Sequence, residues 1–191
     1  ITGAVTMTFD IKSFAAFRIH RQGSQVSARF DDIGLSDLTA GDVVVRVTYS
    51  DINYKDALAA TGTAPILRKY PLVGGIDLAG EVVFSSDRRY TPGQRVLVTG
   101  CGLSETQDGG YAEYARVQGD WVIPIPPGMT DADAMKLGTA GFTAALALPH
   151  HDHGERRDVH QQVDREVEHD RAHAELRRND DAGEHVAHQR R

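Results

Sequence analysis

The sequence is poor in the residues that mark several classes of protein. Its one cysteine, Cys101, cannot form an internal disulfide and is compatible with a reducing compartment, so a cytoplasmic protein is expected. The longest apolar run, AALAL, is far shorter than the roughly 20 residues that a membrane-spanning helix needs. The start of the chain lacks a basic leader with an apolar stretch, which predicts no secretion signal. The net charge is −6 with both signs interspersed, so neither nucleic acid nor membrane is expected as a partner.

Apolar residues are also missing from the last part of the chain. Residues 149–191 contain one leucine and no aromatic residue, Ile, Met, Cys or Lys, yet they hold eight of the nine histidines. Such a segment has too little apolar surface to offset the cost of ordering its backbone, roughly 1–2 kcal/mol per residue. We expect a disordered or loosely helical tail, and its abrupt start suggests a frameshifted or truncated chain. The alternative is a tail that evolved as it stands.

If the tail evolved as it stands, its histidines raise a metal hypothesis. His150, His151 and His153 cluster, and His169 and His173 have the spacing that places two imidazoles on one helix face. Because the tail has no cysteine and no apolar shell, adventitious binding is expected rather than a purposeful metal site.

Before the tail, strand patterns dominate the chain. Alternating and β-branched segments predict a mainly β fold with short helices, of the α+β class. The expected strands are residues 14–20, 26–30, 43–49, 78–85, 95–99 and 111–117, with a first hairpin turning at residues 22–24. The expected helices are residues 53–60 and 132–148, and Thr130 with Asp133 forms a capping box before the second.

Five motifs follow one another in this part of the chain. They read NYKDALA, GIDLAG, PGQRVLVTG, GGYAEYARV and LGTAGFTAAL. In this order and spacing they resemble the medium-chain dehydrogenase/reductase superfamily, and within it the branch of acrylyl-CoA reductases and quinone oxidoreductases. The resemblance implies a GroES-like barrel that supplies the substrate side of a cleft.

The resemblance also divides the chain into parts. It implies an N-terminal extension (1–13), a GroES-like catalytic domain (14–130), a junction helix (131–148) and the charged tail (149–191). In the family a Rossmann domain follows the junction helix. No glycine-rich phosphate loop appears after Leu148, so we expect the Rossmann domain to be missing.

The chemistry that the resemblance implies is hydride transfer from NADPH to a small-molecule substrate. The acceptor would be the β-carbon of an α,β-unsaturated acyl-CoA such as acrylyl-CoA, or a quinone. Asn53 and Tyr54 match the family's pair beside the nicotinamide, which implies catalytic and cofactor-binding roles for both. An amide and a phenol can orient the ring without adding charge. The structural alternative is that Asn53 only caps a helix and Tyr54 packs on the barrel.

Thr139 and Thr143 lie at the implied domain junction, where they can reach the nicotinamide as cofactor-binding residues. The alternative is packing of a core helix, with Gly138 and Gly141 as points of close approach. Asp56 follows the Asn-Tyr pair and fits either a supporting role or a place in the first helical turn.

A zinc site is not implied. Zinc-dependent relatives place Cys and His ligands where this chain has Asn53 and Ile76, and an acidic ligand where it has Asp77. An amide and an alkyl side chain cannot build a tetrahedral zinc site, so a zinc-free enzyme is expected. Asp77 is expected to bond to backbone in the GGID turn rather than to act in catalysis.

Two surface features receive weaker interpretations. Arg68 and Lys69 could meet a CoA phosphate, but a solvated loop pair is favoured. Cys101 lies where relatives usually have an aromatic residue, and no redox role is assigned to it.

Two functions from different classes remain open at this point. One is a truncated NADPH-dependent reductase of activated alkenes or quinones. The other is a catalytically silent GroES-like module or relic that binds no cofactor. In both cases the barrel face towards the absent domain would be exposed and apolar, which predicts self-association.

Overall fold

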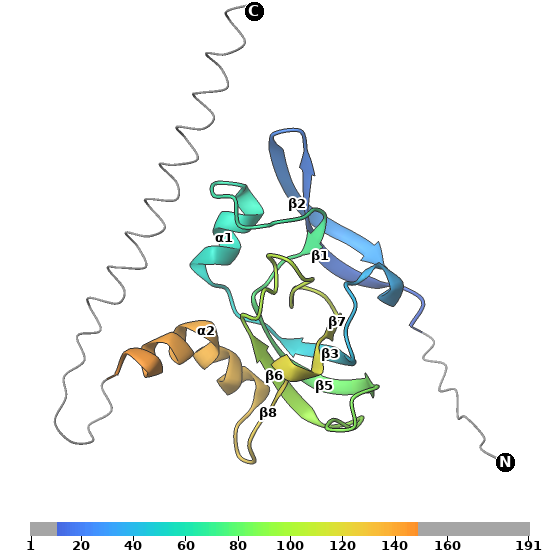
Figure 1. The fold of residues 1–191 in the computed structure, drawn as a ribbon, viewed down its shortest axis with the longest axis vertical. Coiled ribbons are helices and arrows are strands. Elements are labelled where there is room, and N and C mark those ends of the chain that lie inside the picture. The colour runs from blue at the N-terminus through green and yellow to red at the C-terminus, as the bar shows by residue number, and fades with distance from the viewer. Residues whose placement is uncertain (1–10, 149–191) are drawn as a thin grey trace, which may run out of the picture. The chain divides into compact units, whose positions relative to one another are not determined.

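Two antiparallel sheets dominate the computed structural model, which describes residues 11–148 (Figure 1). One sheet has the strand order β2-β1-β4 and the other the order β7-β3-β5-β6-β8. The strands are β1 (Phe14–Gln22), β2 (Gln25–Ile33), β3 (Val43–Tyr49), β4 (Leu72–Val73), β5 (Asp77–Ser85), β6 (Arg95–Thr99), β7 (Tyr114–Val117) and β8 (Ile123–Pro124). The helices are α1 (Tyr54–Thr61) and α2 (Asp131–Ala147), and two 3-10 turns lie at Leu35–Asp37 and Gly119–Trp121. This mainly β architecture with short helices confirms the predicted fold class.

The predicted first hairpin is present as β1 and β2. The two strands pair without interruption from Phe14 opposite Ile33 to Gln22 opposite Gln25. Gly23 supplies the left-handed backbone of the turn, with φ +60°. A single bridge between Ala16 and Ala112 connects this sheet to the segment that leads into β7.

The main core lies on the five-stranded sheet. The β-branched residues at the start of β3 are buried, and the neighbouring strands contribute one buried face each. The fully buried members of this cluster are Val43, Val45, Leu78, Val82, Val96, Val98, Leu103, Ala115 and Val117. Because each buried Val or Leu side chain contributes roughly 1.5–3 kcal/mol on burial, this cluster holds β3, β5, β6 and β7 together.

Three buried aspartates connect segments that are distant in the sequence. Each accepts two backbone N–H bonds, and so replaces the water those groups would otherwise need. Asp108 accepts from Thr39 and Val73, at 2.7 and 2.8 Å; Asp56 accepts from Asn53 and Ile76, at 2.9 and 3.0 Å; Asp77 accepts from Gly100 and Thr139, at 3.2 and 2.9 Å. Two of the three bond to the β4–β5 segment, which holds this segment against its neighbours.

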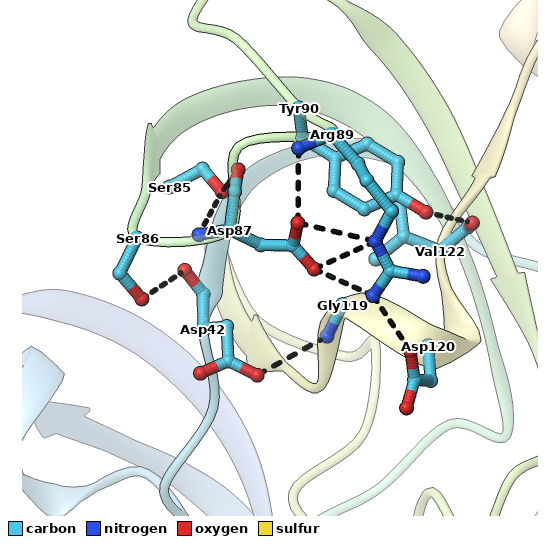
Figure 2. A network of polar contacts seen from close by, with 9 residues as sticks. All are labelled: Asp42, Ser85, Ser86, Asp87, Arg89, Tyr90, Gly119, Asp120 and Val122. Carbon is cyan, nitrogen blue, oxygen red and sulfur yellow. Dashed lines mark hydrogen bonds and ion pairs between the residues drawn. The ribbon is translucent and has the colours of Figure 1, made fainter.

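A further polar network fixes the turn after β5 (Figure 2). Arg89 lies between Asp87 and Asp120, with an N–O distance of 2.6 Å to each. Its hydrogen bonds hold the pKa of the Asp87 carboxyl below its usual range. A Cβ on Gly119 would overlap the Asp87 carboxylate, which explains why glycine occupies the start of the 3-10 turn beneath it.

One predicted strand begins later than expected. Residues 111–113 were predicted as strand, but β7 starts at Tyr114. Tyr111 is bonded to the other sheet instead: its N–H donates to the Gly74 carbonyl at 2.9 Å, and its carbonyl accepts from Phe17 N–H at 2.8 Å. Alternation in the sequence could not distinguish these two sheets.

The predicted helix 132–148 is present as α2, but α2 is two helical segments joined at Gly138, a kink that was not predicted. Gly138 has φ 45° and ψ −155°, far from helical values. Thr139 begins the second segment, and its N–H donates a hydrogen bond to the Asp77 carboxylate. The two-residue strands β4 and β8 were not predicted, because such short elements leave no periodic pattern.

Several predictions fall outside the described residues. These are most of the N-terminal extension, the character of the charged tail and the metal hypothesis for its histidines.

Candidate functional site

The candidate site lies where the loop between β3 and α1 meets the start of β5 and the kink of α2. Asn53 is the residue that precedes α1, and its backbone is extended, with φ −97° and ψ 157°. The Asp56 carboxylate, one turn into the helix, accepts a hydrogen bond from Asn53 N–H at 2.9 Å. This bond fixes the helix start and therefore the direction of the Asn53 side chain.

The Asn53 amide bridges two carboxyl groups. Its Nδ2 donates to Asp51 Oδ1 at 2.7 Å and to Asp77 Oδ2 at 3.0 Å. Both amide hydrogens are thereby used. Asn53 does occupy the cap position of the structural alternative, but its side-chain donors serve the two carboxyl groups.

Asp77 is the centre of this arrangement and is fully buried. Besides Asn53 and Gly100, it accepts two bonds from Thr139, from its N–H at 2.9 Å and from its Oγ1 at 2.5 Å. Asp77 was expected to bond to backbone within its own turn, but its backbone partners lie beyond β6 and in α2. Its negative charge lies at the N-terminus of the second segment of α2, where the helix dipole favours it.

Asp51 lies beside Asp77 and against α2. A Cβ on Gly138 would overlap Asp51 Oδ2 and lie 3.0 Å from Asp77 Oδ2, so only glycine leaves room for both carboxyl groups. Burial, together with the charges of Asp77 and Asp56, raises the pKa of the Asp51 carboxyl to about 7, although the Asn53 hydrogen bond opposes the shift. Near neutral pH this group therefore exists in both protonation states.

Tyr111 supports the same loop from the other side. Its hydroxyl donates to the backbone carbonyl of Asp51 at 2.8 Å. Burial, aided by the neighbouring carboxylates, raises the pKa of the Tyr111 phenol above its usual range, so the phenol stays a neutral donor.

Tyr54, the predicted partner of Asn53, points to solvent. Its side chain is 81% exposed, and the neighbouring Ile52 is 86% exposed. The structural alternative in which Tyr54 packs on the barrel is therefore wrong. An exposed phenol beside an exposed alkyl side chain is available to a ligand, and the cofactor-binding role remains a prediction.

An apolar pocket of about 460 Å³ opens beside the start of α1. Its walls are the side chains of Phe17, Phe30, Ile52, Asp56, Ala57, Ala60 and Tyr111. The only carboxylate among them, Asp56, already accepts two backbone hydrogen bonds. The pocket is thus suited to a neutral apolar group.

The two predicted threonines lie on the second segment of α2. Thr139 donates its hydroxyl to Asp77. Thr143 is exposed and donates its hydroxyl to the Thr139 carbonyl at 2.8 Å. Their hydroxyl oxygens can still accept a hydrogen bond. The structure thus brings Thr139 and Asn53 onto the same carboxylate, although the two are far apart in sequence.

The remaining predicted residues lie at the surface. Arg68 and Lys69 are exposed. Cys101 is exposed too, and partial burial raises the pKa of its thiol, which disfavours the reactive thiolate.

Sequence reasoning missed Asp51 and Tyr111. Asp51 lies two residues before Asn53, so an acidic group next to the predicted cofactor pair was a visible signal. Its pairing with Asp77 depends on the fold, as does the contact of Tyr111 with the loop.

Residues 11–148 hold neither a cluster of metal ligands nor a membrane-spanning helix. This part of the chain brings together no group of three or more His, Cys, Asp or Glu that could hold a metal ion. None of its helices is both long and apolar enough to span a membrane.

Comparison with known proteins places this geometry in a family. Residues 39–127 match the alcohol dehydrogenase GroES-like domain. The chain is 46% identical over 134 residues to the acrylyl-CoA reductase AcuI of Ruegeria pomeroyi, an alignment that covers 70% of this chain and 41% of AcuI. The candidate quinone oxidoreductase YhfP of Bacillus subtilis is 44% identical over 135 residues, covering 71% of this chain and 41% of YhfP.

A solved structure agrees. The yhdH oxidoreductase from Salmonella enterica, in complex with NADP, is 48% identical with a TM-score of 0.67, and the match covers 69% of this chain and 41% of that one. The chain therefore spans about two fifths of the length of the relatives it matches. Residues 39–127 form a GroES-like domain, and the chain is similar to the corresponding part of medium-chain dehydrogenase/reductases of the acrylyl-CoA reductase and quinone oxidoreductase branch.

Proposed function

We propose that the protein acts as an NADPH-dependent oxidoreductase. Its substrate would be an activated carbon–carbon double bond, as in acrylyl-CoA, or a quinone. The observation that carries the proposal is the exposed Tyr54 phenol at the start of α1. Tyr54 follows Asn53, which belongs to the Asn53–Asp77–Thr139 network, and its neighbours Ile52 and Asp56 line an apolar pocket. The relatives named above, with reductase names and a bound NADP, support the same assignment.

The residues present fit a nicotinamide ring. When bound, the cofactor supplies a hydride. Around the candidate position the chain offers the Tyr54 phenol and the hydroxyl oxygens of Thr139 and Thr143, all uncharged hydrogen-bonding groups. The carboxylates of Asp56 and Asp77 lie buried beneath and are bonded to backbone N–H groups. A neutral ring that gains positive charge on oxidation suits an uncharged surface with anions at a distance.

The chain's own contribution to the reaction is positioning and exclusion of water. Asn53 is held by both of its amide hydrogens, so it keeps the start of α1 and hence Tyr54 in one orientation. The Tyr54 phenol can donate a hydrogen bond to a carbonyl oxygen as negative charge develops there. Phe17, Phe30 and Ile52 offer an apolar wall that the apolar part of the acceptor would cover. A cytoplasmic location accords with this chemistry and is proposed with it.

NADPH binding by the complete 191-residue chain tests the proposal. Cofactor fluorescence and calorimetry, with and without acrylyl-CoA, are expected to give micromolar binding. Tyr54→Phe is expected to weaken binding without changing the unfolding midpoint, because the side chain is exposed. Tyr70→Phe, which also removes one phenol hydroxyl but lies away from the network, is the matched control and is expected to bind as the wild type does.

The outcome separates the two functions left open by the sequence. Absence of binding at any accessible NADPH concentration favours the catalytically silent module. If wild type and Tyr54→Phe bind NADPH equally, the reductase proposal stands, but Tyr54 does not contact the cofactor.

A further inference from the structure

We propose that Asp51, in its neutral protonated form, is a positioning residue that holds Asn53 and the kink of α2 against Asp77. The Asp51–Asp77 pair keeps one proton while the site is assembled. Loss of that proton loosens the connection that runs from Asn53 through Asp77 to Thr139 of α2. The consequence for cofactor binding rests on the proposed function, whereas the proton-dependent contact does not.

Three contacts place the two carboxyl groups in one small space. The Asn53 amide donates to both, at 2.7 Å to Asp51 and 3.0 Å to Asp77. A Cβ on Gly138 would overlap an oxygen of Asp51 and lie 3.0 Å from one of Asp77. Two carboxylates this close repel each other unless a proton or a cation lies between them.

The surroundings supply hydrogen bonds to one member of the pair only. Asp77 accepts from Gly100 and from both donors of Thr139, which stabilises its charged form. The Asp51 carboxyl, apart from its contact with Asp77, receives one hydrogen bond within the described residues, from Asn53. The proton therefore belongs on Asp51.

The titratable groups that face Asp51 come from three elements. They are Asp77 of β5, Asp56 of α1 and the phenol of Tyr111, which stays neutral. The strongest influences on the Asp51 pKa are burial and the carboxyl groups of Asp77 and Asp56, which raise it, and the Asn53 hydrogen bond opposes them. Burial and the two neighbouring carboxylates raise this pKa to about 7.

Loss of the proton has a defined structural consequence. A charged Asp51 is repelled by Asp77 and can turn towards solvent, because it is only partly buried. This movement releases one amide hydrogen of Asn53 and empties the space beside Gly138. The Asp51 carboxyl then no longer holds the start of α1, which carries Tyr54. It also no longer supports the start of the second segment of α2, which carries Thr139.

The sign of the pH dependence follows from the raised pKa. The folded protein binds a proton on Asp51 that the unfolded chain has lost above pH ~4. The contribution of Asp51 to stability is therefore complete below that pH and is lost as the pH rises to about 7, after which it stays flat.

The experiment compares the complete wild-type chain with Asp51→Asn and Asp51→Ala. Asp51→Asn keeps a neutral group of the same shape, and Asp51→Ala removes it. The first readout is the unfolding midpoint between pH 5 and 9; the second is the carbon-13 shift of the Asp51 carboxyl over the same range. The third is the NADPH dissociation constant at each pH.

We expect the Asp51 carboxyl to titrate near pH 7 and the wild-type midpoint to fall as the pH rises. Asp51→Asn is expected to keep the high unfolding midpoint and to lose this pH dependence. The unfolding midpoint of Asp51→Ala is expected to be low at every pH. NADPH binding by the wild type should weaken with rising pH, by no more than the tenfold per unit that one proton allows, and stay constant in Asp51→Asn. Titration of Asp51 near pH ~4, or a pH dependence retained in Asp51→Asn, overturns the inference. If NADPH fails to bind at every pH, the proposed function fails, and the first two readouts still decide the role of Asp51.

Discussion

Gly138→Ala tests whether the kink of α2 exists to make room for the carboxyl pair. The backbone of Gly138, at φ 45° and ψ −155°, lies in a region that is almost restricted to glycine, so a side chain there costs about 1–3 kcal/mol. The new Cβ would also displace Asp51 and break its bond with Asn53, which adds about 0.5–1.5 kcal/mol. The free energy of unfolding should therefore fall by about 2–4 kcal/mol.

Urea unfolding with linear extrapolation measures this loss. Gly23→Ala is the matched control, because Gly23 also has a positive φ, +60°, and a Cβ there meets nothing within 4 Å. It should show the cost of a positive φ without crowding, which is smaller than the cost expected for Gly138. In an Asp51→Ala background the obstructing oxygen is absent, so Gly138→Ala should cost about 0.5–1.5 kcal/mol less than in the wild type. Additive effects of the two substitutions, or equal losses for Gly138→Ala and Gly23→Ala, would refute the reasoning.

Three further predictions concern the core, the buried aspartates and the surface. Leu78→Ala should lower the free energy of unfolding by about 2–5 kcal/mol in urea titrations, because this fully buried side chain leaves a cavity. Asp108→Ala should cost about 2–6 kcal/mol, since two buried backbone N–H groups lose their acceptor; Asp120→Ala at the surface, measured alongside, should cost far less. Leu137 and Phe142 are 53% and 60% exposed, and sedimentation should show that changing both to serine reduces self-association. A monomeric wild type at every concentration would contradict this last prediction.

Most of the sheet could be predicted from the sequence because its strands carry strong local patterns. The β-branched run of Val43–Tyr49 and the alternation in β1 each determine an element without long-range information. Turn chemistry was equally local, since Gly23 adopts the positive φ that its hairpin requires.

The features that could not be predicted depend on contacts between distant segments. Tyr111 has a strand-like neighbourhood in sequence, but its backbone bonds to Gly74 and Phe17 across the molecule. Gly138 lies within a strongly helical composition, and its kink follows from a buried carboxylate that belongs to β5. The motifs identified Asn53 and Tyr54 as candidates, but not the Asp51 carboxyl beneath them.

The distribution of donors explains how three carboxyl groups can share one region of this fold. Asp56 accepts two backbone N–H bonds, and Asp77 accepts two backbone N–H bonds, one hydroxyl and one amide hydrogen. The oxygens of both buried carboxyl groups therefore have fixed hydrogen-bond donors. Within residues 11–148, the Asp51 carboxyl accepts one hydrogen bond, from the Asn53 amide that also donates to Asp77. It therefore stays beside Asp77 near neutral pH only when it carries a proton. The network thus depends on a neutral group at Asp51, which lies between Asn53 and Gly138 of α2.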